Sequence, residues 1–179
     1  MSKTIITSDT PQAKLTDTTL HTISVYVNNK PGVLMRITQV FARRGFNIDS
    51  LVVSQTRDNR YSRMTIGLTG SSNGLEQIIK QVTKLVDVIN CQEHHTENTV
   101  VKEMLLIKFL VNASERTEAL QIIDHFDGKG QDITPKSMVA MITGNPTKID
   151  AAINMLSTFE IVETVRTGKV VIARGEHAT

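Results

Sequence analysis

The stretch NNKPGVLMRITQVFARRGFNIDSL, residues 28–51, decides the fold because it places a turn and a helix pattern between two strand patterns. The alternating, β-branched run HTISVYV precedes it and predicts a strand. Pro31 and Gly32 interrupt that pattern, and apolar residues then recur at helical spacing over 33–44. Gly45 stands where a helix-ending glycine is expected. The stretch therefore predicts a strand, an amphipathic helix and a second strand.

The chain continues with the same kinds of pattern as far as His95. Residues 46–57 and 60–70 predict two strands joined by a turn that contains Asp58 and Asn59. SSNGLEQIIKQVTKLV predicts a second amphipathic helix, and DVINCQEHH closes the unit as a strand. The order is βαββαβ, the ferredoxin-like plan, in which two helices pack on one face of an antiparallel sheet.

The same order recurs after the polar segment TENTVVK. EMLLIKFLVN predicts a strand, SERTEALQIIDHF a helix, and residues 131–145 strand material broken at Pro135. Pro146 opens a fourth helix, and residues 160–175 supply the last strands. A shift of 74 positions superposes the apolar positions of the second and fourth helices. The fold class is therefore α+β, with two ferredoxin-like βαββαβ domains over residues 20–96 and 101–176 that follow a flexible tail, residues 1–19.

The composition is that of an ordinary globular protein, with 40% hydrophobic and 21% charged residues. The formal net charge of +2 gives little support to nucleic acid as a partner. No run approaches 18 apolar residues, so no membrane span is predicted. The single cysteine, Cys91, fits a reducing cytoplasm. The Ser/Thr-rich tail lacks the apolar core of a secretory signal, and its two Asp and absent Arg make organellar import unlikely.

No catalytic or metal-binding motif stands out. The sequence lacks the nucleophile elbow, the zinc-protease motif, the P-loop and a dinucleotide fingerprint. His94 and His95, with Glu93 and Glu97 nearby, could bind a metal, but adjacent strand residues point to opposite faces. Cys91 lies in an apolar run and is interpreted as a small core residue. We expect no catalysis, no metal site and no cofactor in this chain.

The first half of the chain is locally basic. Its arginines suit either a solvated face or the docking of an acidic partner protein. These charges are not interleaved with a regular series of aromatic residues, so base stacking is not indicated. The residues concerned are Arg36, Arg43, Arg44, Arg57, Arg60 and Arg63.

The residues around the first helix also suit a small amino acid. The unpaired N–H groups of a helix N-terminus bind a carboxylate, and Gly32 lets a ligand approach the backbone. Asn29 and Asn47 offer the amide donors and acceptors that hold an α-carboxylate and an α-ammonium. Three apolar residues could line the pocket: Val33, Leu34 and Ile48. A plain turn with an Asn cap explains the same residues equally well.

The pattern NNKPGVLMRITQVFARRGFNIDSL, followed by SRMTI and LVDVI, resembles the ACT domain of the acetohydroxyacid (acetolactate) synthase small subunit. The segments EMLLIKF, DITPKSMVAMITGNPTKIDAAINML and VRTGKVVIARG resemble that family's C-terminal domain. The resemblance covers about residues 20–176. Lys30 and Pro31 differ from the acidic and serine residues of some members, but Asn29, Gly32 and Asn47 fit the family pattern.

This resemblance implies a non-catalytic regulatory subunit and an ACT–ACT homodimer. Its partner would be the large, catalytic subunit, which carries thiamine diphosphate, Mg²⁺ and FAD and makes acetolactate or acetohydroxybutyrate. The small subunit would activate that enzyme and confer feedback inhibition, usually by valine, otherwise by leucine or isoleucine. The implied effector site lies between paired ACT domains. Its predicted residues are Asn29, Lys30, Pro31, Gly32, Val33, Leu34 and Met35 on one side, with Asn47 and Ile48 on the other.

Two alternatives stay open on the sequence. The chain could be a stand-alone ACT-domain sensor that acts on a different enzyme or regulator, or its second domain could bind a metal. The first would need a dedicated DNA-binding helix or another target, and no such helix is evident. The second would need converging ligands, and residues 101–179 contain only His125 and His177 and no cysteine.

Overall fold

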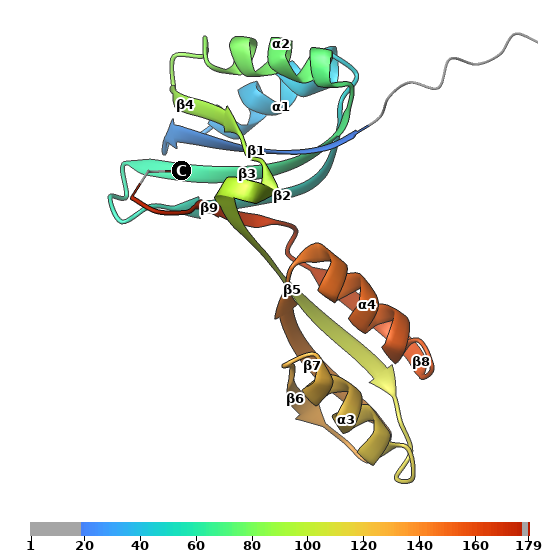
Figure 1. Ribbon diagram of the computed structural model, residues 1–179. Coiled ribbons are helices and arrows are strands. Elements are labelled where there is room, and N and C mark those ends of the chain that lie inside the picture. The colour runs from blue at the N-terminus through green and yellow to red at the C-terminus, as the bar shows by residue number, and fades with distance from the viewer. Residues whose placement is uncertain (1–18, 177–178) are drawn as a thin grey trace, which may run out of the picture.

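The computed structural model describes residues 19–176 and residue 179 (Figure 1). The tail predicted over residues 1–19 therefore lies outside the described residues, except for Thr19, which opens the first strand. The first half of the chain forms β1 (Thr19–Asn28), α1 (Val33–Arg43), β2 (Asn47–Gln55), β3 (Tyr61–Gly70), α2 (Ser72–Val82) and β4 (Val88–Glu93). The short 3-10 helix η1 (Thr96–Asn98) follows.

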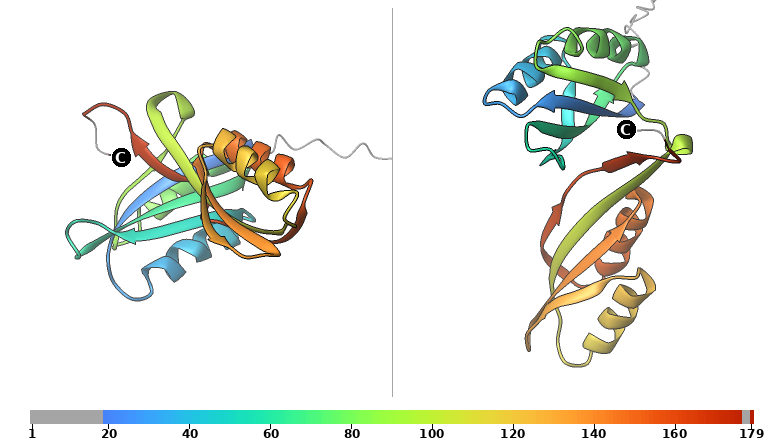
Figure 2. Two further views of the ribbon diagram at one scale, coloured as in Figure 1. Left: turned by 90° about the horizontal axis from the view of Figure 1, so that it is seen from below. Right: turned by 90° about the vertical axis from the view of Figure 1, so that its left-hand side faces the viewer.

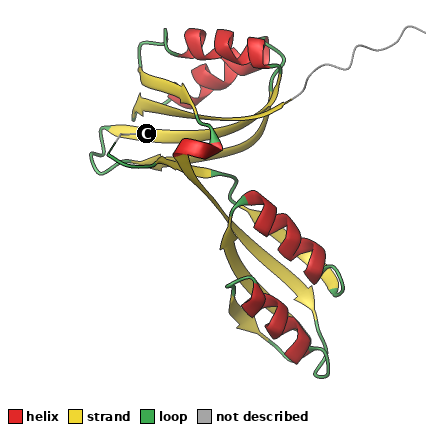
Figure 3. Cartoon of the chain, in the orientation of Figure 1, coloured by secondary structure: helices red, strands yellow, loops and turns green. Residues whose placement is uncertain are grey.

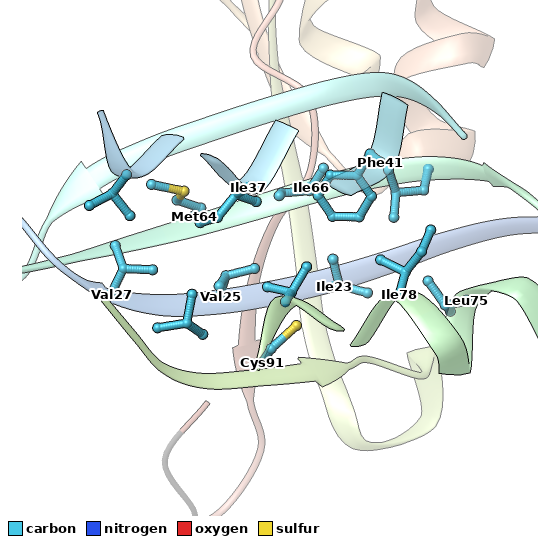
Figure 4. Close-up of a cluster of buried hydrophobic side chains, with 14 residues drawn as sticks. Ile23, Val25, Val27, Ile37, Phe41, Met64, Ile66, Leu75, Ile78 and Cys91 are labelled. Atoms are coloured by element: carbon cyan, nitrogen blue, oxygen red, sulfur yellow. The ribbon is translucent and has the colours of Figure 1, made fainter. Parts of the chain in front are cut away.

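The four strands of this half form an antiparallel sheet in the order β2-β3-β1-β4, and α1 and α2 cover one of its faces (Figures 1 and 3). Alternate residues of β1 and β3 point toward the helices, as the period of two requires. They meet the apolar faces of α1 and α2 in an aliphatic core (Figure 4). Ile37 and Phe41 of α1 and Ile66 and Leu68 of β3 are fully buried in this core.

The second half repeats this plan. It comprises β5 (Thr99–Leu110), α3 (Arg116–His125), β6 (Lys129–Ile133), β7 (Ser137–Gly144), α4 (Pro146–Leu156), β8 (Glu160–Arg166) and β9 (Val170–Ala173). Its sheet has the order β6-β7-β5-β8, with α3 and α4 on one face. The predicted repeat is confirmed, because α2 and α4 begin and end 74 positions apart. Asn145 caps α4 by accepting the Lys148 N–H at 2.8 Å, and Pro146 opens the helix.

A single strand joins the two halves. The polar segment between the domains was expected to reach residue 102, but β5 already begins at Thr99. Its first four residues pair with β9, and Glu103–Leu110 pair with β7 in the second sheet. The two-stranded ribbon of β5 and β9 lies beneath the first sheet, on the face without helices (Figure 2). The long-range pairing with β9 explains the early start of the strand, which local composition does not reveal.

The face of the first sheet that lacks helices is therefore partly covered. Thr22, Ser24 and Thr65 lie on this face, opposite the core residues of β1 and β3, and are buried. Val171 of β9 is buried as well. At the chain end, Arg63 donates a hydrogen bond of 2.9 Å to the carbonyl of Thr179. The first domain is consequently packed on both faces of its sheet.

Candidate effector site

The turn before α1 leaves the helix N-terminus open. Gly32 occupies the N-cap position with φ +81°, a left-handed conformation that strongly favours glycine. No side chain within the described residues caps this helix. The backbone N–H groups of Leu34 and Met35 likewise find no carbonyl partner there. Unpaired N–H groups at a helix N-terminus form a ready-made site for a carboxylate.

Hydrogen bonds to two neighbouring loops fix the position of the turn before α1. The Asn29 N–H donates to the Arg60 carbonyl at 2.7 Å, and the Asn29 side-chain amide donates to the Asn59 carbonyl at 2.9 Å. The Asn28 N–H donates to the Asp87 carbonyl at 2.8 Å. Asn29 therefore stands next to the hairpin between β2 and β3, and its side-chain oxygen accepts no hydrogen bond from the described residues.

Asp87, which precedes β4, organises the charges beside this turn. Its carboxylate accepts a 2.5 Å hydrogen bond from Arg36 and lies 3.4 Å from the Lys30 ammonium. Burial opposes ionisation of Asp87, but hydrogen bonds from Lys30 and Asn28 and the charges of Lys30 and Arg36 outweigh it. The pKa of the Asp87 carboxyl is consequently held below its usual value. Sequence reasoning missed Asp87, because it lies 51 positions from Arg36.

The side chains of the turn divide into buried and exposed ones. Val33 is 3% exposed and belongs to the core, so only its backbone faces the turn. Leu34 is 36% and Met35 64% exposed. Lys30 and Pro31 are exposed too. An apolar contribution from this side of the predicted pocket would therefore come from Leu34 and Met35.

Asn47 and Ile48 open β2, at the other end of α1. The Asn47 side-chain amide donates to the Asp49 carboxylate at 2.7 Å, and the Thr69 hydroxyl donates to the other oxygen of that carboxylate. A β-bulge at Asp49 separates Ile48 from the regular ladder with β3. α1 has 11 residues, which corresponds to about 16 Å of helix. One copy of the chain therefore does not bring the two predicted halves of the site together.

The predicted alternatives to an effector site receive no support from the side-chain positions. Burial raises the pKa of the Cys91 thiol to about 12, which confirms an inert core residue. His94 shares a 2.6 Å hydrogen bond with Ser24, whereas Glu93 lies 2.8 Å from His21. Burial, followed by the charges of Arg63 and His95, lowers the pKa of His94. Across the described residues, no group of three or more His, Cys, Asp or Glu could hold a metal ion.

The arginines of the first half do not act as one cluster. Arg36 pairs with Asp87, Arg60 with Asp58 at 2.6 Å, and Arg44 donates to Gln81 at 3.4 Å. Arg36 and Arg60 thus have carboxylate partners near the turn before α1, whereas Arg44, at the other end of this helix, contacts a neutral amide. In the part of the chain that the structure describes, no helix is long and apolar enough to cross a membrane.

A sheet of order β2-β3-β1-β4 beneath two helices is the ferredoxin-like plan, the fold class to which ACT domains belong. The family model described as the AHAS small subunit-like ACT domain matches residues 23–90. The model described as the small subunit of acetolactate synthase matches residues 102–175.

Known proteins agree over nearly the whole chain. An acetolactate synthase small subunit of Mycobacterium bovis is 41% identical over 155 residues, which is 87% of this chain and 92% of the relative. A probable small subunit of Archaeoglobus fulgidus is 41% identical and covered to 97%. The crystal structure of the Thermotoga maritima small subunit superposes with a TM-score of 0.81 at 37% identity, over 89% of this chain and 99% of that one. This chain belongs to the acetolactate synthase small subunit family.

Proposed function

We propose that this chain is the regulatory subunit of an acetolactate synthase that activates the catalytic subunit and makes it sensitive to a branched-chain amino acid, valine in the first place. Family membership supports the subunit role. The observation that carries the effector site is the open N-terminus of α1 beside Asn29. The chain acts in the cytoplasm and supplies no chemistry of its own.

A second copy of the chain completes the site. β1 and β2 run in the same direction, because each is antiparallel to β3. Asn47 therefore lies at the end of the sheet where β1 starts, and Asn29 at the opposite end, beside the hairpin that follows β2. β2 is an edge strand of this sheet. Two-fold antiparallel pairing of two β2 edges would bring Asn47 of each copy toward Gly32 of the other and create two equivalent sites.

The surface along this edge suits such a dimer. Val53 of β2 is 45% exposed, and Met35 of α1 is 64% exposed. Arg36 points toward Asp87 near β4, so Leu34, about 200° away around the helix, faces the β2 side. Pairing would cover these apolar side chains and the unpaired backbone groups of the strand. The proposed effector site therefore forms only when the proposed homodimer forms.

The chemistry of the assembled site matches an aliphatic amino acid. The effector carboxylate would accept from the N–H groups of the first turn of α1, and the oxygens of Asn29 and Asn47 would accept from its ammonium. Leu34, Met35 and Ile48 would surround its side chain. Bound across the seam, the effector favours one arrangement of the paired domains. A coupling on the order of 1–3 kcal/mol changes catalytic activity several-fold to a hundredfold.

The partner of this chain is proposed to be the acetolactate synthase catalytic subunit, which would carry thiamine diphosphate, Mg²⁺ and FAD. The decisive experiment is reconstitution of the two purified subunits with pyruvate. Addition of this chain should raise acetolactate formation, and valine should then lower it. The chain alone, with all three cofactors, should form no acetolactate. Turnover by the chain alone, or an unchanged rate on its addition, would refute the regulatory role.

The site itself is tested by titration calorimetry with valine, leucine and isoleucine. Asn47→Ala should weaken binding at least about tenfold, which corresponds to about 1.4 kcal/mol. Asn154→Ala, a change of an exposed asparagine on α4, is the matched control and should leave the Kd unchanged. Equal affinities of the two variants would show that β2 does not contribute to the site.

A further inference from the structure

Ser50 of β2 is held between glycines of both domains. A Cβ atom at Gly168, in the loop between β8 and β9, would lie 2.6 Å from the Ser50 Cβ. A Cβ atom at Gly67 of β3 would lie 2.5 Å from the Ser50 Oγ. Contacts below 3.0 Å force a shift of one neighbour, so each position accepts only glycine while Ser50 stays in place. Gly168 also has φ +79°, which favours glycine independently.

The loop that carries Gly168 is fixed to the second domain. Thr167 and Met104 exchange two hydrogen bonds of 3.1 Å, one between backbone groups and one from the Met104 N–H to the Thr167 hydroxyl. Arg166 donates to the Glu103 carboxylate at 2.5 Å and to Asp150 of α4 at 2.7 Å. Glu103 is only 6% exposed. A displacement of Gly168 would therefore move β5 and α4 with it.

The same serine directly follows the β2 half of the proposed effector site. Asn47 is tied to Asp49 through a 2.7 Å hydrogen bond, and Asp49 forms the bulge next to Ser50. Bulges bend a strand and re-aim its neighbouring residues. A ligand that shifts Asn47 thus acts on a strand segment whose next side chain touches the second domain.

We propose that Ser50 is a positioning residue that transmits effector occupancy from β2 to the second domain through its contact with Gly168. This inference rests on the proposed effector site. Because there is no room for even a methyl group between Gly168 and Ser50, a shift of Ser50 toward this glycine displaces the β8–β9 loop. The effector signal leaves the ACT domain at this contact, and the rest of the covered sheet face acts as a passive support.

Three variants test this inference in the full-length chain bound to its catalytic subunit. Gly168→Ala inserts a methyl group against Ser50, and Ser50→Gly empties the contact. The double variant places the new methyl group in the volume that the serine vacates. Gly175→Ala is the matched control, because Gly175 has φ +74° but nothing within 4 Å of its added Cβ. Thermal unfolding of each variant verifies that it is folded.

The readouts are the valine Kd and the ratio of catalytic rates without and with saturating valine. Each single variant should keep the Kd but reduce this ratio about fivefold or more, the lower range of coupling between sites. The double variant should restore the ratio, and Gly175→Ala should leave it unchanged. A role in folding alone would not give this rescue, which is the signature of direct contact.

The outcomes separate this inference from the proposed function. If the wild-type chain binds valine and inhibits, but Gly168→Ala resembles Gly175→Ala, the Ser50 contact transmits nothing and the inference falls alone. Absence of rescue in the double variant overturns it as well. Should Gly168→Ala fail to fold, the Ser50→Gly variant provides the test: an unchanged ratio of the rates without and with valine would overturn the inference. If the wild-type chain neither binds nor responds to valine, leucine or isoleucine, the proposed function and the inference fall together.

Discussion

The turns before α1 and α3 occupy equivalent places in the two domains but are built in opposite ways. Before α3, Asn112 accepts hydrogen bonds from the N–H groups of Ser114 and Glu115 at 2.9 and 3.1 Å. The Asn112 N–H in turn donates to the Glu115 carboxylate at 3.0 Å. Before α1, Asn29 donates away from the helix instead, and Gly32 leaves the first N–H groups open.

This difference supports the proposal that the first domain holds the effector site. Neither helix has a side-chain cap among the described residues, but Asn112 already occupies the N–H groups of Ser114 and Glu115. The first turn of α3 also carries the acidic Glu118, which opposes a carboxylate. The first turn of α1 contains no acidic residue. Arg116 adds to the closure before α3 by donating to the carbonyls of Thr134 and Pro135, both at 3.1 Å. The two domains thus share one fold but differ in the side chains before their first helices, and this difference favours the first domain as the place of the proposed effector site.

The strongest way to break the comparison is to place a negative charge in each turn. Gly32→Asp combines a strained left-handed backbone with repulsion of the effector carboxylate. We expect a loss of valine affinity of at least about a hundredfold, or roughly 2.7 kcal/mol, in titration calorimetry. Ala113→Asp brings the same charge to the turn before α3 and should leave the affinity unchanged. Comparable losses would place the effector elsewhere.

Removal of the asparagine side chain should mainly lower stability in the turn before α3, but mainly lower valine affinity in the turn before α1. Asn112→Ala leaves two N–H groups without their acceptor and should lower the free energy of unfolding by about 1 kcal/mol, without changing valine affinity. Asn29→Ala should cost less stability but weaken valine binding. Urea unfolding and calorimetry on both variants measure the two quantities. A larger stability loss for Asn29→Ala would contradict the distinction.

The smallest expected effect is that of removing the charge of Asp87, which pairs with Lys30 and Arg36 beside the turn before α1. Its pKa is lowered in the folded protein, so its ionised form stabilises the fold above the unfolded pKa, and this contribution is lost as the pH falls through the folded pKa. Asp87→Asn should therefore lower the Tm slightly at pH 7. The difference from wild type should shrink below about pH 4. A difference that persists unchanged at pH 3 would exclude an electrostatic role.

Much of the fold could be predicted from local patterns. The presence of α1, the starts of α2 and α4 and the break at Pro135 follow from periodicity, capping and turn chemistry, which act within a few residues. The end of α2 at Val82 falls four residues before the end of the predicted helix pattern. The early start of β5 could not be predicted, because residues 99–102 become a strand through pairing with β9, about 70 positions away. The burial of Thr65 has the same origin.

The candidate site was predicted in part. Gly32 and the asparagines carry recognisable chemistry, and the left-handed conformation of Gly32 gives this glycine a structural reason. Asp87 could not be predicted, since its partners Lys30 and Arg36 become its neighbours only in the folded domain. Val33 was expected to line the pocket with its side chain, which the structure places in the core.

The sequence by itself determined the elements, their order and the repeat, because hydrophobic period, glycine and proline act on the adjacent backbone. It also determined the family, through residues spread along both halves. The tertiary structure decided what those residues can do together. It separated Asn29 from Asn47 by about the length of α1, so that one copy of the chain does not bring them together. It also brought Ser50 against Gly168, 118 positions later in the chain, because only folding through β5 and β9 brings the two domains into contact.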